Sequence, residues 1–251
     1  MTDLARRIVK DIEGLHPFVP REDEISGLAH AYAVQREVNA RLIESRLGRH
    51  VAGYKIAFNR PSSMDYYRLR EPCHAPIFSD QLHISGVELS LASFADLVIE
   101  PEIALRVVAP VSVTQGFDEL ALAVEALPSI EIMDVRGAFA HDPSAAAAIA
   151  QRIHGEGAVV GAAVPFLASA VHEASLSVDG RIDGSARDAA PQPPLAALHW
   201  LIGALARTGE SLQPGMVVLT GAHLPGRPIR APGTIKVEIA PYGDVTLQMR
   251  P

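Results

Sequence analysis

The chain has 251 residues, of which 48% are hydrophobic and 20% charged, so it has the length and apolar content of a globular protein and not of a disordered one. The net charge of −7 argues against nucleic acid or an anionic membrane as the main partner, because both need a basic surface. The single cysteine, Cys73, excludes an intrachain disulfide and a cysteine-based zinc cluster, and indicates a reducing compartment.

Two further features bear on location. The N-terminal segment 1–11 is charged and lacks the apolar core of a signal peptide. The longest apolar stretch, Leu195–Ala206, is too short to cross a bilayer. We therefore expect a cytoplasmic enzyme with neither a membrane nor a nucleic acid as partner.

Residues 1–50 are predicted to be helical. Between Glu24 and Leu47, apolar residues recur at spacings of three and four, and Gly48 stands where a helix commonly ends. From Val51 the sequence changes to short runs of Val, Ile and aromatic residues separated by Gly and Pro. These runs predict strands near 51–58, 96–108, 129–135, 158–163, 174–178, 216–220, 234–239 and 244–249.

The last two predicted strands flank Ala-Pro-Tyr-Gly at 240–243, which is typical of a hairpin turn. Helical patterns separate other strands, at 117–126, 143–153 and 195–207, while 141–157 and 179–192 suggest surface excursions. The sum is a β-rich α+β protein. We divide it into an N-terminal helical region, 1–50, and a β-rich catalytic domain, 51–251, which form one compact unit.

Three glutamates indicate a metal site. Glu100 and Glu102 stand two residues apart in an apolar strand and therefore point to the same face, and Glu131 lies in a second apolar strand. Neighbouring like charges are costly in such a setting unless a cation binds them, and Mg²⁺ or Mn²⁺ suits carboxylate ligands. The simpler alternatives are that Glu100 and Glu102 line a solvated face of an edge strand, which Pro101 would permit, and that Glu131 lies on a half-exposed strand and pairs with an arginine.

Two more segments carry candidate substrate-binding residues. Lys55 shares a strand face with Gly53 and Ala57, whose small size would leave room for a ligand; alternatively, its stem covers apolar surface while its ammonium group reaches water. Thr220 and Gly221 lie where a predicted strand enters a glycine-bearing loop, which lets backbone N–H groups approach a substrate. The nearby His223 is a candidate proton carrier, although a surface position is the simpler interpretation.

Together these segments resemble the fumarylacetoacetate hydrolase superfamily, and within it the branch of 2-keto-4-pentenoate hydratases and 4-oxalocrotonate decarboxylases. The resemblance covers nearly the whole chain. It rests on Ala31-Tyr-Ala-Val-Gln, Gly53-Tyr-Lys-Ile, Ile99-Glu-Pro-Glu-Ile-Ala, Leu127-Pro-Ser-Ile-Glu-Ile, Pro194-Leu-Ala-Ala-Leu-His-Trp-Leu, Val218-Leu-Thr-Gly-Ala and the terminal hairpin.

The resemblance implies a mixed β-roll, an oligomer and a Mg²⁺ or Mn²⁺ site at Glu100, Glu102 and Glu131, with Lys55 as the active-site lysine. It also implies hydration of a 2-hydroxy-2,4-dienoate or 2-oxo-enoate in aromatic-compound catabolism. The alternatives are a 4-oxalocrotonate-type decarboxylase, an acylpyruvate hydrolase, and a catalytically weak 2-oxo-acid binder or partner subunit. A homo-oligomer and a complex with a homologous decarboxylase or hydratase are the expected assemblies.

The sequence departs from the family pattern at three places. Ala57 replaces a usual glycine, and Cys73 replaces an aspartate implicated in proton transfer. The family's Asp-Asn-Ala-Ser segment has no clean counterpart between His141 and Val160. The three metal ligands are therefore expected to be present, while some of the family's proton-transferring residues are replaced.

Overall fold

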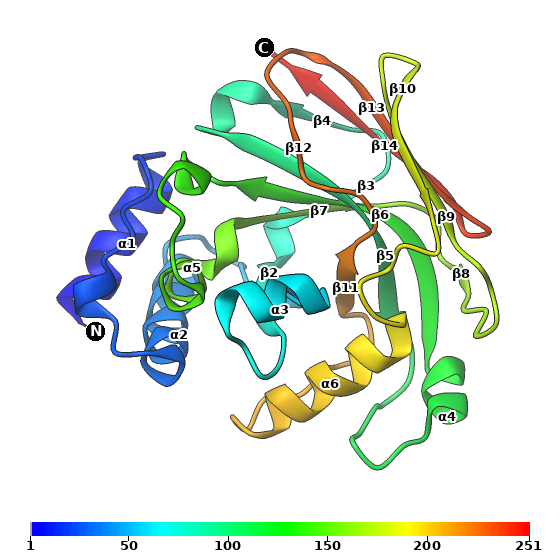
Figure 1. Ribbon diagram of the computed structural model, residues 1–251, viewed down its shortest axis with the longest axis horizontal. Coiled ribbons are helices and arrows are strands. Elements are labelled where there is room, and N and C mark those ends of the chain that lie inside the picture. Colours follow the sequence, from blue (N-terminus) through cyan, green and yellow to red (C-terminus); the bar gives the residue numbers. More distant parts are fainter. Residues whose placement is uncertain (1) are drawn as a thin grey trace.

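The computed structural model describes residues 2–251 (Figure 1). Its α-helices are α1 Asp3–Glu13, α2 Leu28–Glu44, α3 Pro61–Tyr67, α4 Phe117–Leu122, α5 Ala145–Ala150 and α6 Pro194–Ala206. Its strands are β1 Val51–Ala57, β2 Cys73–Phe78, β3 Leu82–Ile84, β4 Val87–Ser90, β5 Leu97–Val107, β6 Val124–Asp134, β7 Gly155–Val160, β8 Val164–Pro165, β9 Glu173–Val178, β10 Arg181–Arg187, β11 Val217–Ala222, β12 Arg227–Pro228, β13 Gly233–Ala240 and β14 Gly243–Arg250.

Within residues 2–251 the strands form two sheets. The larger has the order β2-β1-β11-β5-β6-β7-β3, with β12 added beside β5 and β8 beside β6. The smaller has the order β10-β9-β13-β14-β4. The inner faces of the two sheets share one apolar core, to which Ile103, Ile132, Val237 and Leu247 all contribute. This arrangement confirms the expected β-rich α+β class.

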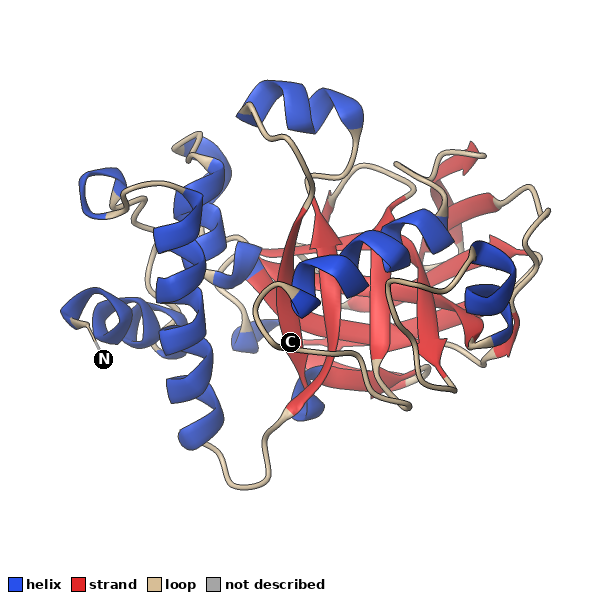
Figure 2. Ribbon diagram, turned by 90° about the horizontal axis from the view of Figure 1, so that it is seen from below, coloured by secondary structure: helices blue, strands red, loops and turns tan. Residues whose placement is uncertain are grey.

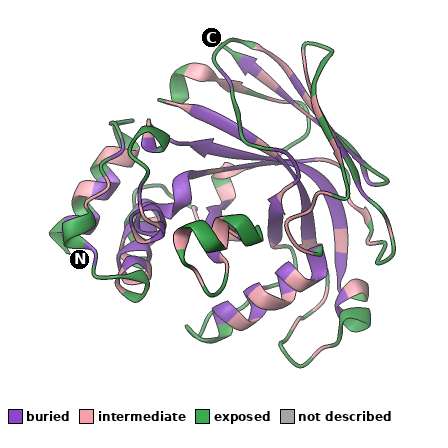
Figure 3. Ribbon diagram, viewed as in Figure 1, coloured by how far each residue is buried: buried purple, intermediate pink, exposed green. Residues whose placement is uncertain are grey.

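The longest strands, β5 and β6, form the centre of the larger sheet. They pair antiparallel along their whole length, and in that register Glu100 lies directly opposite Glu131. Both strands are almost entirely buried, which Figure 3 shows as largely purple ribbon. The strand that carries Glu100 and Glu102 is therefore an interior strand, and the solvated edge strand considered from the sequence is excluded.

The N-terminal helices pack to one side of the strands, as Figure 2 shows. The α1 helix is amphipathic and buries Leu4, Ile8 and Val9, and α2 packs against both α1 and α5. These helices share a second apolar core with β2, which contributes Cys73 and Phe78. The β2 strand thus joins the helical region to the larger sheet.

The predicted helical character of the first fifty residues and the C-terminal hairpin are confirmed, but several boundaries were wrong. The helix expected over 117–126 ends at Leu122 because β6 begins at Val124, five residues before the expected strand. The stretch 179–192 lies at the surface as expected, and it also contains β10, which was not predicted. Strand β10 is an exposed edge strand paired only with β9, so its sequence lacks the apolar pattern that marks a buried strand.

Candidate metal and substrate site

The three glutamates meet at one point of the larger sheet. One carboxylate oxygen from each of Glu100, Glu102 and Glu131 can be chosen so that all lie within 4.8 Å of one another. The two-residue spacing in β5 places Glu100 and Glu102 on one face, and the β5–β6 register brings Glu131 to the same place. Glu102 and Glu131 are 1% and 3% exposed, and Glu100 is partly buried.

The electrostatics of this cluster favour a cation. Burial and the neighbouring Glu131 raise the pKa of Glu100 to about 8, and the same causes raise the pKa of Glu102 well above its ordinary value. The Gly221 N–H donates to Glu102 Oε2 at 2.7 Å, and this hydrogen bond offsets part of the rise in the pKa of Glu102. Buried carboxylates that repel one another in this way form the type of oxygen donor set that Mg²⁺ and Mn²⁺ prefer, so the residues fit a hard divalent ion.

Lys55 lies beside this cluster. Its Nζ donates to Glu131 Oε1 at 2.5 Å and to the Ile153 carbonyl oxygen at 2.6 Å, and only 3% of the residue is exposed. The alternative in which the ammonium group reaches water is therefore excluded. An ammonium group has three donors, so one N–H remains for a ligand.

Two glycines near Lys55 leave space for neighbouring atoms, one for the adjacent strand and the other for the lysine side chain. A Cβ on Gly53 would stand 2.0 Å from the Val217 carbonyl oxygen, so the missing side chain permits the β1–β11 approach and the expected ligand space at Gly53 was wrong. A Cβ on Gly155 would lie 3.3 Å from Lys55 Cε. The room for the lysine is therefore provided by β7, a strand far away in the sequence.

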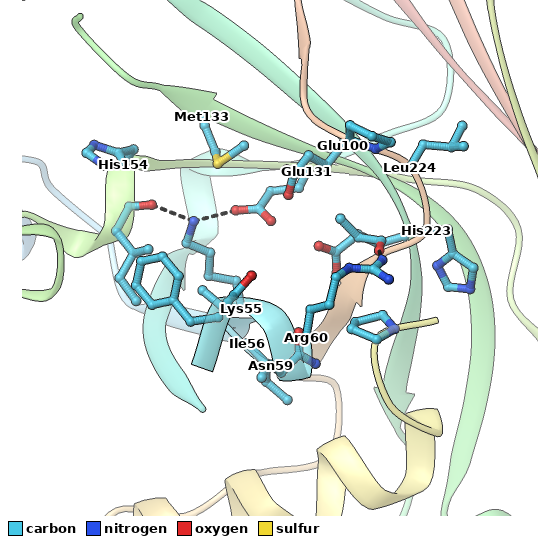
Figure 4. Close-up of a pocket in the computed structure, with 18 of the residues that line it drawn as sticks. Lys55, Ile56, Asn59, Arg60, Glu100, Glu131, Met133, His154, His223 and Leu224 are labelled. Carbon is cyan, nitrogen blue, oxygen red and sulfur yellow. Dashed lines mark hydrogen bonds and ion pairs between the residues drawn. The ribbon is translucent and has the colours of Figure 1, made fainter. Parts of the chain in front are cut away.

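A cavity of about 760 Å³ opens over these residues. Figure 4 shows Lys55 and the glutamates Glu100 and Glu131 pointing into it. Apolar side chains including Ile56, Met133 and Leu224 line other parts of the wall. A largely apolar cavity with a few convergent charged groups is typical of a site for a small polar ligand.

The predicted substrate-binding pair Thr220 and Gly221 lies behind this cavity wall. The Thr220 hydroxyl donates to the Ile103 carbonyl oxygen at 2.7 Å, and Thr220 is 1% exposed. The Gly221 N–H is engaged by Glu102. Neither residue contributes to the cavity lining, which includes the next residues, Ala222 and His223. The structure thus brings together four of the six candidate site residues and places the other two in supporting contacts.

The cavity residues outside the predicted site include Arg60, His154 and His223. His223 is 2% exposed, so the surface position favoured from the sequence was wrong. Burial holds the pKa of His154 at about 3 and that of His223 at about 4, so both rings are neutral at pH 7. The chain contains ten histidines, and nothing in their local sequence separates these two from the others.

Cys73, which replaces the family's aspartate, does not line the cavity. It belongs to the core shared by β2 and the N-terminal helices, is 2% exposed, and its thiol pKa is raised to about 12 by burial. His74 lines a separate cavity with Tyr32 and Trp200. Cys73 is thus a buried apolar residue here, and acid–base chemistry falls to other groups.

The sequence of this chain is similar to those of known hydratases. No protein-family model matches the sequence. A 2-keto-4-pentenoate hydratase of Burkholderia vietnamiensis is 28% identical over 223 residues, covering 86% of this chain and 83% of that protein. A protein called TodF product hydratase, from Pseudomonas putida, is 27% identical over 229 residues, covering 87% of this chain and 83% of the relative.

Solved structures give the same fold. The 4-oxalocrotonate decarboxylase from Pseudomonas putida G7, complexed with magnesium and adipate, superposes with a TM-score of 0.88 at 21% identity, covering 98% of this chain and 96% of the other. A putative fumarylacetoacetate hydrolase family protein from Yersinia pestis gives a TM-score of 0.59 at 15% identity, covering 81% of this chain and 95% of the other.

The fold is that of the fumarylacetoacetate hydrolase superfamily, with a cluster of three carboxylates and a lysine on its larger sheet. Within that superfamily, the resemblance to the branch of 2-keto-4-pentenoate hydratases and 4-oxalocrotonate decarboxylases is confirmed.

Proposed function

We propose that this chain is a divalent-metal-dependent hydro-lyase that adds water to a 2-hydroxy-2,4-dienoate or 2-oxo-enoate, as a 2-keto-4-pentenoate hydratase does. The observation that carries the proposal is the convergence of Glu100, Glu102 and Glu131 beside buried Lys55 in one cavity. The names of its sequence relatives support hydration.

The three glutamates would hold Mg²⁺ or Mn²⁺. The fit rests on three converging carboxylates, two of them buried, where burial and mutual repulsion raise the pKa values of Glu100 and Glu102. Structural neighbours complexed with calcium, magnesium or Mn²⁺ support a divalent ion. When bound, such an ion supplies Lewis-acid stabilisation of negative charge at the 2-oxo end of a substrate.

Lys55 would bind the substrate carboxylate or move a proton through its remaining N–H. The Glu131 carboxylate and the Ile153 carbonyl oxygen hold the ammonium group in place, which limits the reorganisation needed during reaction. Because Cys73 lies elsewhere, Lys55 is the principal candidate for the proton carrier beside the glutamates. The expected homo-oligomer, and an expected complex with a homologous enzyme, remain predictions.

A substrate panel tests the proposal. Metal-stripped protein is assayed with 2-hydroxypenta-2,4-dienoate and with 4-oxalocrotonate, each with and without added Mg²⁺ or Mn²⁺. A hydratase should consume the dienoate, measured as a loss of its absorbance, only when metal is added, and it should release no CO₂. Release of CO₂ from 4-oxalocrotonate would instead favour the decarboxylase alternative.

Matched variants connect turnover to the glutamates. Glu131→Gln should abolish metal-dependent turnover. Glu125→Gln on the same strand should retain it, since Glu125 pairs with Arg106 outside the cavity. Metal-dependent binding of oxalate without turnover on any panel member would support the catalytically weak binder. Absence of both binding and turnover would refute the proposed function.

A further inference from the structure

One wall of the cavity carries an arginine without an acidic partner. Among residues 2–251, Arg60 makes no ion pair, and its Nη2 donates to the carbonyl oxygens of Ala189 at 3.2 Å and Ala222 at 3.0 Å. These two bonds fix the guanidinium group, while Nε and Nη1 keep their donors free. Arginine presents its donors as a planar fork that matches a carboxylate.

His223 lies close to this arginine. This residue is 2% exposed and lines the cavity, yet neither Nδ1 nor Nε2 of its ring has a close hydrogen-bond partner within residues 2–251. A buried polar group without a partner is costly, and native proteins satisfy nearly all such groups. Arg60 Nη2 donates to the carbonyl oxygen of Ala222, the residue before His223, so both side chains stand at the same end of the cavity.

The backbone is shaped to present both side chains. The register of β11 against β5 shifts between Leu219 and Ala222, and this bulge precedes His223. On the other side, Phe58 after β1 has a φ of +56°, an uncommon conformation for a bulky residue, just before Arg60. Two irregular segments from different parts of the chain thus converge at one end of the cavity.

This end differs from the one where Glu131 binds Lys55. In Figure 4, Glu131 lies between Lys55 and His223, with Arg60 on the same side as His223. A bare hydrocarbon tail would offer the buried imidazole no partner and would make no use of the guanidinium charge. A second carboxylate on the substrate would accept from both.

We infer that Arg60 and His223 form a subsite for a second carboxylate, so that the preferred substrate is a 2-oxo or enol diacid. This inference rests on the proposed function, because the glutamate cluster must hold the oxo-acid end for the far end to reach Arg60. The neutral imidazole contributes one N–H donor, and the guanidinium contributes charge and direction. Both residues determine specificity at this subsite.

A pair of matched ligands tests the inference. We would titrate the Mg²⁺-loaded protein by calorimetry with 2-oxohexanedioate and 2-oxohexanoate, which share the 2-oxo-acid end and differ in the terminal carboxylate. Oxalate, which lacks any far end, serves as reference. The diacid should bind about tenfold to hundredfold more tightly than the monoacid, the range expected for a hydrogen bond to a charged group.

Variants assign this preference to the two residues. Arg60→Met and His223→Leu should each reduce it at least several-fold while oxalate affinity stays unchanged, and Arg60→Lys should retain part of it. The ring nitrogens of His223 make no close hydrogen bond within residues 2–251, and unchanged oxalate affinity in His223→Leu would show that the variant folds. The control is Arg181→Met, on exposed β10, which should behave as wild type.

The outcomes separate the two proposals. Metal-dependent oxalate binding with equal affinity for diacid and monoacid would overturn the diacid inference alone. A preference that survives in both Arg60→Met and His223→Leu would also overturn it. Failure of oxalate to bind in the presence of Mg²⁺ would refute the oxo-acid site, and with it the proposed function.

Discussion

Replacing Glu100 with glutamine should remove a large part of the pH dependence of the metal-free protein's stability. In the folded protein, burial and Glu131 raise the pKa of Glu100 from 4.5 to about 8. Between these two values the unfolded chain has released the proton and the folded chain has kept it. Stability therefore falls as pH rises through this window, because the unfolded state binds fewer protons.

The magnitude follows from the shift. At 1.36 kcal/mol per pKa unit, Glu100 should lower the free energy of unfolding by about 3 kcal/mol between about pH 5 and about pH 8. Glu100→Gln eliminates this contribution and also reduces the repulsion on Glu102, whose raised pKa has Glu100 among its causes. The free energy of unfolding of the variant should therefore change less between pH 5 and pH 8 than that of wild type, and it should be higher than that of wild type at pH 8.

Urea unfolding of wild type and Glu100→Gln in EDTA, over that pH range, measures the difference directly. A repeat with saturating Mg²⁺ should raise the stability of wild type at pH 8, because an ion that binds only the folded state stabilises it. If the two metal-free proteins lose stability in parallel, within about 0.5 kcal/mol, the repulsive carboxylate cluster does not exist in solution.

Three more predictions follow from single contacts. Glu102→Gln should weaken Mn²⁺ binding by at least about a hundredfold in calorimetry, since losing a group that only supports a ligand costs about 10- to 100-fold. Lys55→Met should lower turnover by roughly 10²–10⁴-fold. In EDTA, it should lower the free energy of unfolding by about 3–5 kcal/mol, because it leaves buried Glu131 without its cation. Gly221→Ala should destabilise the protein by about 1–3 kcal/mol in urea unfolding, since Gly221 has a φ of +113° and a Cβ would lie 2.5 Å from Pro191 Cγ.

Each of these has a contradicting result. Unchanged Mn²⁺ affinity in Glu102→Gln would place the ion elsewhere. Full turnover and full oxalate affinity in Lys55→Met would reject both roles of the lysine, whereas retained oxalate binding with lost turnover would identify it as the proton carrier. Wild-type stability in Gly221→Ala would show that the loop relaxes around a side chain.

The sequence alone indicated the three glutamates as a candidate metal site because strand periodicity is local. Glu100 and Glu102 share a face through the two-residue repeat of a strand, and Glu131 stands in a second apolar strand. The resemblance to a known family then indicated their common role and that of Lys55. The C-terminal hairpin could likewise be predicted from the sequence, because its turn residues are adjacent in the chain.

Tertiary structure alone decided what surrounds the cluster. Lys55 is buried because β7 supplies Gly155 and the turn before it supplies the Ile153 carbonyl oxygen, and no property of Lys55's own strand predicts either contact. Arg60 and His223 meet only because β1 and β11 pair in parallel from distant parts of the chain. Burial and pKa depend on neighbours contributed by other segments, so these residues acquire their chemistry only when the sheet forms.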